Sequence, residues 1–251
     1  EAPSEPGPAA GFEGVLPGES YVEGSGKSGE PTEQVAGTSF NTTLYAVDAD
    51  GVIVDSGSNV YTGSKQITFS GPAASPSGKL PTYDTRDGYP SSTVTITVTF
   101  TNGVATVPVI LYQAISGVQI TAVDQGADPD VSGVSSAFKL APANPTSGTV
   151  NGLIPVSSRQ YAFYEVPVNL EMLLSDAYGN FCDNFTGPGE TFVLYDHNSD
   201  TDLRSLVDYP FESETIQFQA GTWRSDGFVL QTSDFQNTSK TFWNTQFLFQ
   251  A

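Results

Sequence analysis

Residues 93–113 read TVTITVTFTNGVATVPVILYQ, and this stretch decides the fold class. Two runs of alternating apolar and polar residues, rich in β-branched side chains, predict two strands. Between them stands Asn102-Gly103, a dipeptide that favours positive φ at both positions and therefore predicts a type I′ hairpin. Pro108 inside the second run predicts a sheet edge or a bulge at that point.

The same period of two recurs along most of the chain. GFEGVL at 11–16 predicts a first strand, and further alternating runs occupy 40–48, 65–70, 117–124, 134–140 and 168–176. We find no window of 11 residues with a convincing helical period. The sequence therefore predicts an all-β protein with very little helix.

Three short motifs occur twice in the same order. VDADG (47–51) aligns with SDAYG (175–179), VYTG (60–63) with NFTG (184–187), and FTNG (100–103) with FQAG (218–221). The offsets shrink from 128 to 124 to 118, so the second copy has shorter loops. About seven strand candidates per copy are typical of an immunoglobulin-like sandwich. We predict two tandem immunoglobulin-like β-sandwich domains, at 11–140 and 150–251, with a flexible N-terminal arm at 1–10 and a linker at 141–149.

A known family has similar segments. AGTSFNTTLYAVDADGVIVD (36–55), YTGSKQITFSGPA (61–73), VTFTNGVATVPVILYQA (98–114) and VQITAVD (118–124) resemble bacterial immunoglobulin-like (Big-type) tandem repeats of prokaryotic surface proteins. The resemblance covers 36–140 well and 141–251 only loosely. It implies architecture, export, and a mechanical or adhesive role, and it brings no catalytic residues.

Charge and cysteine content exclude several classes of function. The chain has 9 basic and 28 acidic residues, a net charge of −19, which argues against partners such as nucleic acid and anionic membranes. Such acidity permits divalent cations, and either an extracellular or a halophilic origin would account for it. The single cysteine, Cys182, excludes an internal disulfide. EAPSEPGPAA at 1–10 has no apolar core segment and resembles the start of a mature product whose export signal was removed. We therefore expect an extracellular, cell-surface location and no membrane insertion.

The sequence offers poor material for catalysis. The one histidine, His197, lies in a polar loop, and no Gly-x-Ser-x-Gly elbow occurs. With 28 acidic residues, a pair of carboxylates that hydrolyses sugars stays an open alternative. Most of these acidic residues, however, lie in turns. We expect a protein that is not an enzyme.

Calcium is the best of the chemical hypotheses, because hard cations bind clusters of loop oxygens. The candidate ligands are Asp48, Asp50 and Asp55; Asp124, Asp128 and Asp130; and Asp196, Asn198, Asp200 and Asp202. The last group, DHNSDTD, lacks the Gly and Glu of an EF-hand loop. The alternative is that these residues make turns and bind no metal. No other cofactor is expected.

Two segments are candidates for subunit contacts. The alternation in TFWNTQFLFQ (241–250) puts apolar side chains on both faces of one strand, which predicts cover from a partner as well as the chain's own core. The apolar tip of residues 1–16 could add as a strand to a neighbour's sheet. The candidate contact residues are Phe12, Val15, Leu16, Phe242, Trp243, Phe247, Leu248 and Phe249.

These expectations combine into one functional hypothesis. We expect a structural subunit of a cell-surface assembly such as a pilus-like filament, fibre or surface layer, joined by strand exchange into a homo-oligomer or filament. The alternative is a Ca²⁺-dependent or carbohydrate-binding adhesin module that contacts surface glycans, and an accessory module of a secreted enzyme is a third. Asn41, Asn184 and Asn237 stand in Asn-x-Ser/Thr sites and are candidate glycan acceptors.

Overall fold

The computed structural model describes residues 5–86, 88–155, 167–188, 195–196, 201–202, 216–224 and 228–229. These residues form strands, turns and loops, and no helix occurs among them, which confirms the all-β prediction. The chain divides into two compact units, Glu1–Ala141 and Pro142–Ala251, which are described separately.

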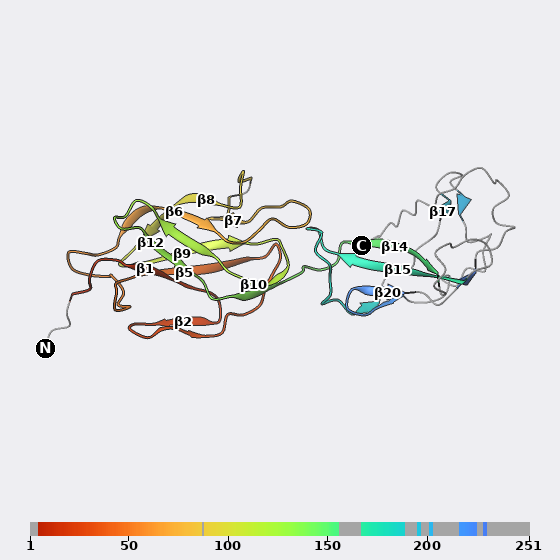
Figure 1. Cartoon of the computed structure of the whole chain (residues 1–251), viewed down its shortest axis with the longest axis horizontal. Coiled ribbons are helices and arrows are strands. Elements are labelled where there is room, and N and C mark those ends of the chain that lie inside the picture. The colour runs from red at the N-terminus through yellow and green to blue at the C-terminus, as the bar shows by residue number, and fades with distance from the viewer. Residues whose placement is uncertain are drawn as a thin grey trace. The chain divides into compact units, whose positions relative to one another are not determined.

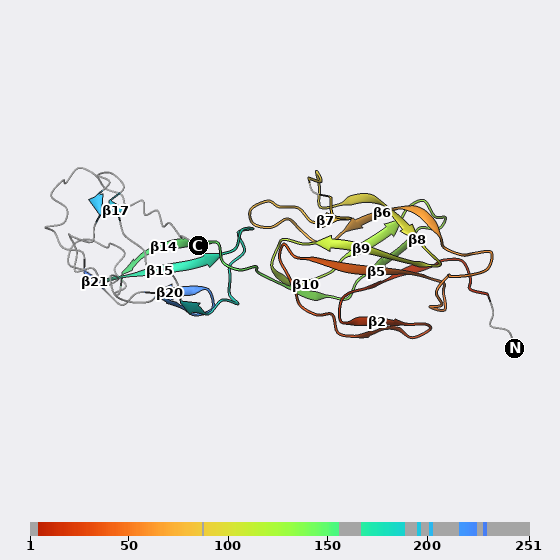
Figure 2. The same cartoon turned by 180° about the vertical axis from the view of Figure 1, so that it is seen from behind.

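The first unit is β-sandwich-like (Figures 1 and 2). Its two four-stranded antiparallel sheets have the orders β1-β5-β9-β7 and β12-β11-β6-β8. Smaller pairings join β10, β13 and β4, and join β2 with β3. The strands are β1 (Gly11–Val15), β2 (Glu19–Val22), β3 (Gly26–Gly29), β4 (Gln34–Val35), β5 (Ser39–Val47), β6 (Gly63–Ser70), β7 (Thr82–Tyr83), β8 (Val94–Phe100), β9 (Val104–Ile110), β10 (Ile115–Val118), β11 (Thr121–Asp124), β12 (Val131–Val134) and β13 (Phe138–Ala141).

The core lies between the two large sheets, because alternate side chains of their strands are buried. Leu44 and Val107 point inward from one sheet, and Ile67 and Ile96 point inward from the other. An aromatic cluster closes one part of this core, with Phe12 stacked on Phe100 at 5.6 Å and Tyr61 edge-on to both rings. Burial of each large apolar side chain contributes about 2 kcal/mol to folding.

The hairpin predicted from residues 93–113 is confirmed as β8 and β9. Asn102 and Gly103 have φ values of 47° and 77°, the positive pair that a type I′ turn requires. A Cβ on Gly103 would lie 2.7 Å from Ile53 Cγ2 and 3.1 Å from the Val54 carbonyl oxygen. The position therefore demands glycine for its space as well as for its φ.

Pro108 is accommodated differently from the prediction. It lies in β9 without a bulge, and β9 is not an edge strand, because β7 pairs with its last residues. The Pro108 carbonyl accepts the Asp84 N–H at 3.0 Å on the β7 side. Because the nitrogen and the carbonyl of one strand residue point to the same side, Pro108 removes no hydrogen bond from the β5–β9 ladder.

The second unit repeats the strand pairing of the first where the structure describes it. Its sheet β14-β15-β20, which β21 extends, corresponds to β1-β5-β9, and the pair β16–β19 corresponds to β6–β8. The remaining described pair is β17–β18. The strands are β14 (Ser147–Pro155), β15 (Pro167–Ser175), β16 (Gly187–Pro188), β17 (Tyr195–Asp196), β18 (Thr201–Asp202), β19 (Gln217–Phe218), β20 (Thr222–Arg224) and β21 (Phe228–Val229).

The registers agree residue by residue with the motif alignment. The partners Leu44↔Ala105 and Gly63↔Phe100 of the first unit recur as Met172↔Trp223 and Gly187↔Phe218 in the second. Each pair keeps the offset that the sequence motifs have. The repeated motifs therefore mark equivalent places in two copies of one strand arrangement.

The N-terminal segment differs from the free arm that the sequence suggested. β1 pairs with β5 of the same chain along its whole length, and Phe12, Val15 and Leu16 are buried in the chain's own core. Their predicted role as contacts to a neighbour does not apply while β1 stays in this sheet. Residues 5–10 are also anchored. The Ala10 N–H donates to the Val47 carbonyl at 2.7 Å, and the Gly7 N–H donates to the Asp48 carboxylate at 2.9 Å.

The predicted linker at 141–149 is shorter in the structure. Ala141 is the last residue of β13, and its carbonyl accepts the Ala36 N–H at 2.9 Å within the first unit. β14 begins at Ser147, so residues 142–146 alone lie between the two strands.

The two hairpin turns yield a test of backbone strain. Ala220 occupies the place of Asn102 with a φ of 48°, and alanine tolerates positive φ less well than asparagine. We expect Ala220→Asn to stabilise the second unit by about 0.5–1 kcal/mol, and Asn102→Ala to destabilise the first unit by a similar amount.

Urea denaturation checks both variants. Trp223 and Trp243 both belong to the second unit, so tryptophan fluorescence follows that unit, whereas far-ultraviolet circular dichroism follows both. Shifts of the same sign in the two variants would contradict the assignment of equivalent strained positions.

Candidate functional site

A polar arrangement that connects distant parts of the first unit surrounds Asp48, at the end of the central strand β5. Its Oδ1 accepts the backbone N–H groups of Asp50 and Val52, both at 2.9 Å, and its Oδ2 accepts the Gly7 N–H at 2.9 Å. Asp48 is buried, with 8% of its surface exposed. The N–H groups of Val52 and Gly7 hold the pKa of the Asp48 carboxyl below its usual value.

The second unit has the same arrangement around Asp176. Its Oδ1 accepts the backbone N–H groups of Tyr178 and Asn180, both at 2.9 Å. Its Oδ2 accepts the Ala143 N–H at 3.0 Å, and also the Asn180 side-chain amide at 2.8 Å. In both units one carboxylate therefore holds the turn after the central strand and the segment that enters the unit.

An asparagine completes the arrangement in each unit. Asn59 Nδ2 donates to the Pro6 carbonyl at 3.0 Å, and Asn184 Nδ2 donates to the Pro142 carbonyl at 3.2 Å. Both prolines are buried and immediately precede the residue whose N–H the aspartate accepts. We call this arrangement the entry clamp, and it consists of Pro6, Gly7, Asp48 and Asn59 in the first unit and Pro142, Ala143, Asp176 and Asn184 in the second.

Sequence reasoning found the two aspartates but missed their partners. The available signal was an asparagine two residues before the aromatic-Thr-Gly motif in the first unit and one residue before it in the second, together with a proline upstream of each first strand. These residues lie 33–53 positions from the groups they bind. A local reading of the sequence could not connect them.

A cleft of about 700 Å³ lies beside the entry clamp of the first unit. The entry segment, the Asp48–Val52 turn and the loop around Asp128 line it, and Tyr61 and Lys65 form part of its wall. Tyr61 donates a hydrogen bond to the buried Asp124 carboxylate, and burial raises the pKa of the Tyr61 phenol. The Lys65 ammonium lies 4.7 Å from the centre of the Tyr61 ring.

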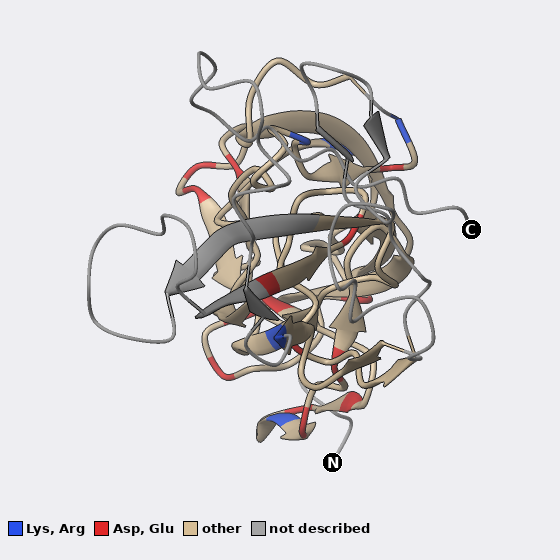
Figure 3. Ribbon diagram, turned by 90° about the vertical axis from the view of Figure 1, so that its right-hand side faces the viewer, with Lys and Arg blue, Asp and Glu red and all other residues tan. Residues whose placement is uncertain are grey.

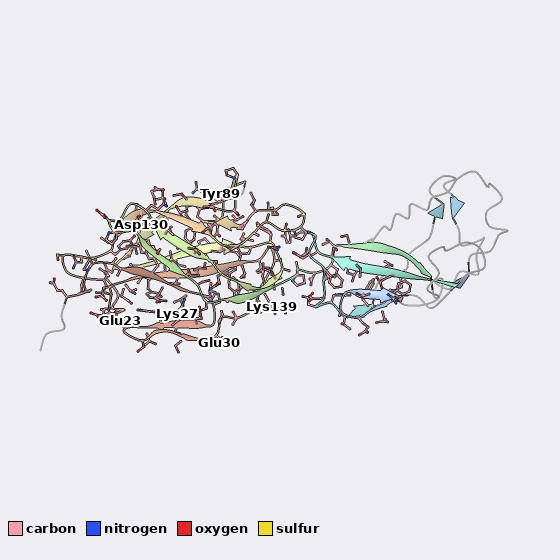
Figure 4. The ribbon with its side chains drawn as sticks, in the orientation of Figure 1. Glu23, Lys27, Glu30, Tyr89, Asp130 and Lys139 are labelled. Carbon is pink, nitrogen blue, oxygen red and sulfur yellow. The ribbon has the colours of Figure 1, made fainter. Side chains whose placement is uncertain are left out.

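The structure does not bring the predicted calcium ligands of the first unit together. Asp48 uses both oxygens on backbone N–H groups, while Asp50 and Asp55 are exposed. Asp128 and Asp130 are also exposed, and Figure 4 labels Asp130 on the first unit. Within the part of the chain that the structure describes, no group of three His, Cys, Asp or Glu residues could hold a metal ion.

Most of the predicted site residues in the second unit lie outside the described part of the chain. Asp196 and Asp202 lie on the paired strands β17 and β18. Asn198, Asp200 and the lone His197 lie outside the described residues, as do the remaining predicted residues Asn237, Phe242, Trp243, Phe247, Leu248 and Phe249.

The other predicted polar sites and the cysteine are placed. Asn41 is exposed on β5, and Asn184 is exposed while its amide serves the entry clamp. Cys182 is fully buried, and this burial, aided by Asp176 and Asp183, raises the pKa of its thiol to about 12. The Cys182 thiol is therefore protonated and unreactive at neutral pH.

Acidic residues dominate the charge of the molecule (Figure 3). Among the described residues, no helix is long and apolar enough to cross a membrane. A comparison with models of known protein families finds no match, and neither does a comparison with curated proteins.

Loss of the clamp carboxylate is expected to weaken the first unit. Asp48→Ala leaves the N–H groups of Gly7, Asp50 and Val52 without their acceptor, and we expect it to lower the free energy of unfolding by about 2 kcal/mol. Asp50→Ala is the matched control, because it removes the same charge from an exposed side chain two residues away. Urea denaturation followed by circular dichroism measures both, and equal losses would contradict the clamp's contribution.

The same carboxylate makes the stability of the first unit depend on pH. The pKa of Asp48 is lower in the folded state than in the unfolded chain, where an aspartate has a pKa of about 3.9. This stabilisation is fully present above the unfolded pKa and is lost as the pH falls through the lower folded pKa. We expect the free energy of unfolding of the wild type to fall more steeply below about pH 4 than that of Asp48→Asn. Parallel curves for the two proteins would contradict the expectation.

Proposed function

We propose that the chain is a non-enzymatic structural subunit of an extracellular cell-surface assembly, such as a pilus-like filament, a fibre or a surface layer. In this proposal its units are tandem immunoglobulin-like sandwiches of the Big-type kind. The observation that carries the proposal is the entry clamp, which recurs with the same hydrogen bonds around Asp48 and Asp176.

The entry clamp has a mechanical consequence. It binds two successive residues of the entering chain, one through its carbonyl and the next through its N–H. A pull on the chain must break these bonds before it reaches the first strand of the unit. Repeated reinforcement of this kind favours a protein that carries load over a protein that performs chemistry.

The sheet orders and the buried carboxylates give further support. Two facing sheets with the orders β1-β5-β9-β7 and β12-β11-β6-β8 are compatible with an immunoglobulin-like sandwich. The buried carboxylates Asp48, Asp124 and Asp176 all accept hydrogen bonds from N–H or O–H donors. Groups committed in this way are poor candidates for acid–base catalysis or for binding calcium.

Electron microscopy of the concentrated protein tests the proposal. We expect negative staining to show fibres or sheets of the full chain, and we expect a chelator to leave them unchanged, because the described carboxylates form no metal site. Single particles at every concentration would contradict the proposal. Glycan binding that requires added Ca²⁺ would favour the adhesin alternative instead.

A further inference from the structure

The outer strand β8 has an open edge. It stands last in the order β12-β11-β6-β8, and β6 is its only strand partner among the described residues. Figures 1 and 2 show β8 at the margin of the first unit. Its seven residues alternate between buried and exposed, and they pair with β6 without a bulge. Along its outer side, the N–H and carbonyl groups of alternate residues are therefore available to another strand.

The opposite edge of this sheet is covered. β12 lies against β1 so closely that a Cβ on Gly133 would meet the Phe12 carbonyl oxygen at 1.9 Å. The two large sheets therefore approach each other along β1 and β12, whereas β8 pairs on its outer side with no other described strand. Within the described part of the first unit, the β8 edge is therefore the one that another strand could extend.

β8 also lacks the features that normally protect an edge strand. Natural edges carry charged side chains, prolines or bulges that prevent pairing with another molecule. β8 has none of these, and its exposed side chains are Thr95, Thr97 and Thr99. The uncharged stretch is longer than the strand, because no Asp, Glu, Lys or Arg occurs anywhere in residues 88–123.

The charge distribution makes β8 the place where a second copy can approach with the least repulsion. At a net charge of −19, two copies repel each other over most of their surfaces, and repulsion is smallest where the surface has no charge. An antiparallel pairing centred on Thr97 places Thr95 opposite the partner's Thr99 and keeps the buried faces of both strands on one side. We propose that β8 pairs with β8 of a second copy about a two-fold axis, which joins the two sheets into one of eight strands.

The first unit already contains the side-chain pairs that this contact would repeat. Across the β6–β8 ladder, Thr68 Oγ1 lies 2.8 Å from Thr95 Oγ1, and Gln66 Nε2 lies 2.8 Å from Thr97 Oγ1. Cross-strand threonine pairs of this kind stabilise a sheet. A contact through one strand buries less than the roughly 1,600 Å² of a standard interface, so the pairing is reversible and depends on concentration.

This inference rests on the proposed function, because the β8 pairing is one lateral joint of the proposed assembly. Sedimentation equilibrium of the full chain tests it with two lysine variants. Thr97→Lys places two like charges face to face across the two-fold axis, and we expect association about tenfold weaker or more. Gln66→Lys is the matched control, because it adds the same charge to the same face of the sheet but on β6, which lies next to β8 and away from the open edge. Both substitutions remove the same Gln66–Thr97 hydrogen bond. We expect Gln66→Lys to associate as the wild type does.

Cysteine cross-linking provides a positive readout. We expect Thr97→Cys to form a disulfide-linked dimer under mild oxidation and Gln66→Cys to form none, while the native Cys182 stays buried in both. Equal association of the two lysine variants, or the absence of a Thr97→Cys dimer, would overturn the β8 pairing.

The outcomes separate this inference from the proposed function. Assemblies that persist unchanged in Thr97→Lys would overturn the β8 pairing and leave the proposed function standing. A wild type that stays monomeric, with no assemblies under the microscope, would overturn both.

Discussion

One buried carboxylate per unit ties together segments that are far apart in the sequence. Asp48 stands where the central strand ends, and its two oxygens bind the following turn on one side and the entering chain on the other. Because an unpaired buried carboxylate is costly, both sets of N–H groups must be in place when the unit folds. The clamp thereby holds the chain just before β1, which pairs with β5 and carries Phe12 of the aromatic cluster.

The repeated motifs were readable from the sequence because their causes are local. Gly103 and Gly221 are required by positive φ and by lack of space, and a Cβ on Gly221 would lie 2.3 Å from the Cys182 carbonyl oxygen. An Asp followed by a glycine turn is equally local, since the Asp side chain binds N–H groups two and four residues ahead. Strand periodicity completed the all-β prediction. Alignment of these motifs therefore gave the equivalence of the two units before any long-range contact was known.

What the sequence did not give depends on long-range partners. Residues 1–10 and 141–149 have the Pro, Ala and Gly content of linkers, but composition cannot reveal that Gly7 and Ala143 each donate to a distant carboxylate. The calcium hypothesis for Asp48 also depends on such partners, because both of its oxygens accept backbone N–H groups in the structure. A turn aspartate whose oxygens face solvent and one whose oxygens bind N–H groups look alike in sequence. Likewise, alternation in β1 predicts a strand without saying whose sheet that strand joins.

The entry clamp and the open β8 edge act in different directions on the same unit. The clamp strengthens the covalent path along the chain, where Pro6 and Gly7 lead into β1. β8 lies in the other sheet, and its edge allows growth sideways through backbone hydrogen bonds. In the proposed assembly, acidic residues would keep other faces of separate copies apart, and lateral contact would fall on the uncharged stretch at 88–123. A chain reinforced along its length and adhesive along one narrow edge would favour ordered growth over random aggregation.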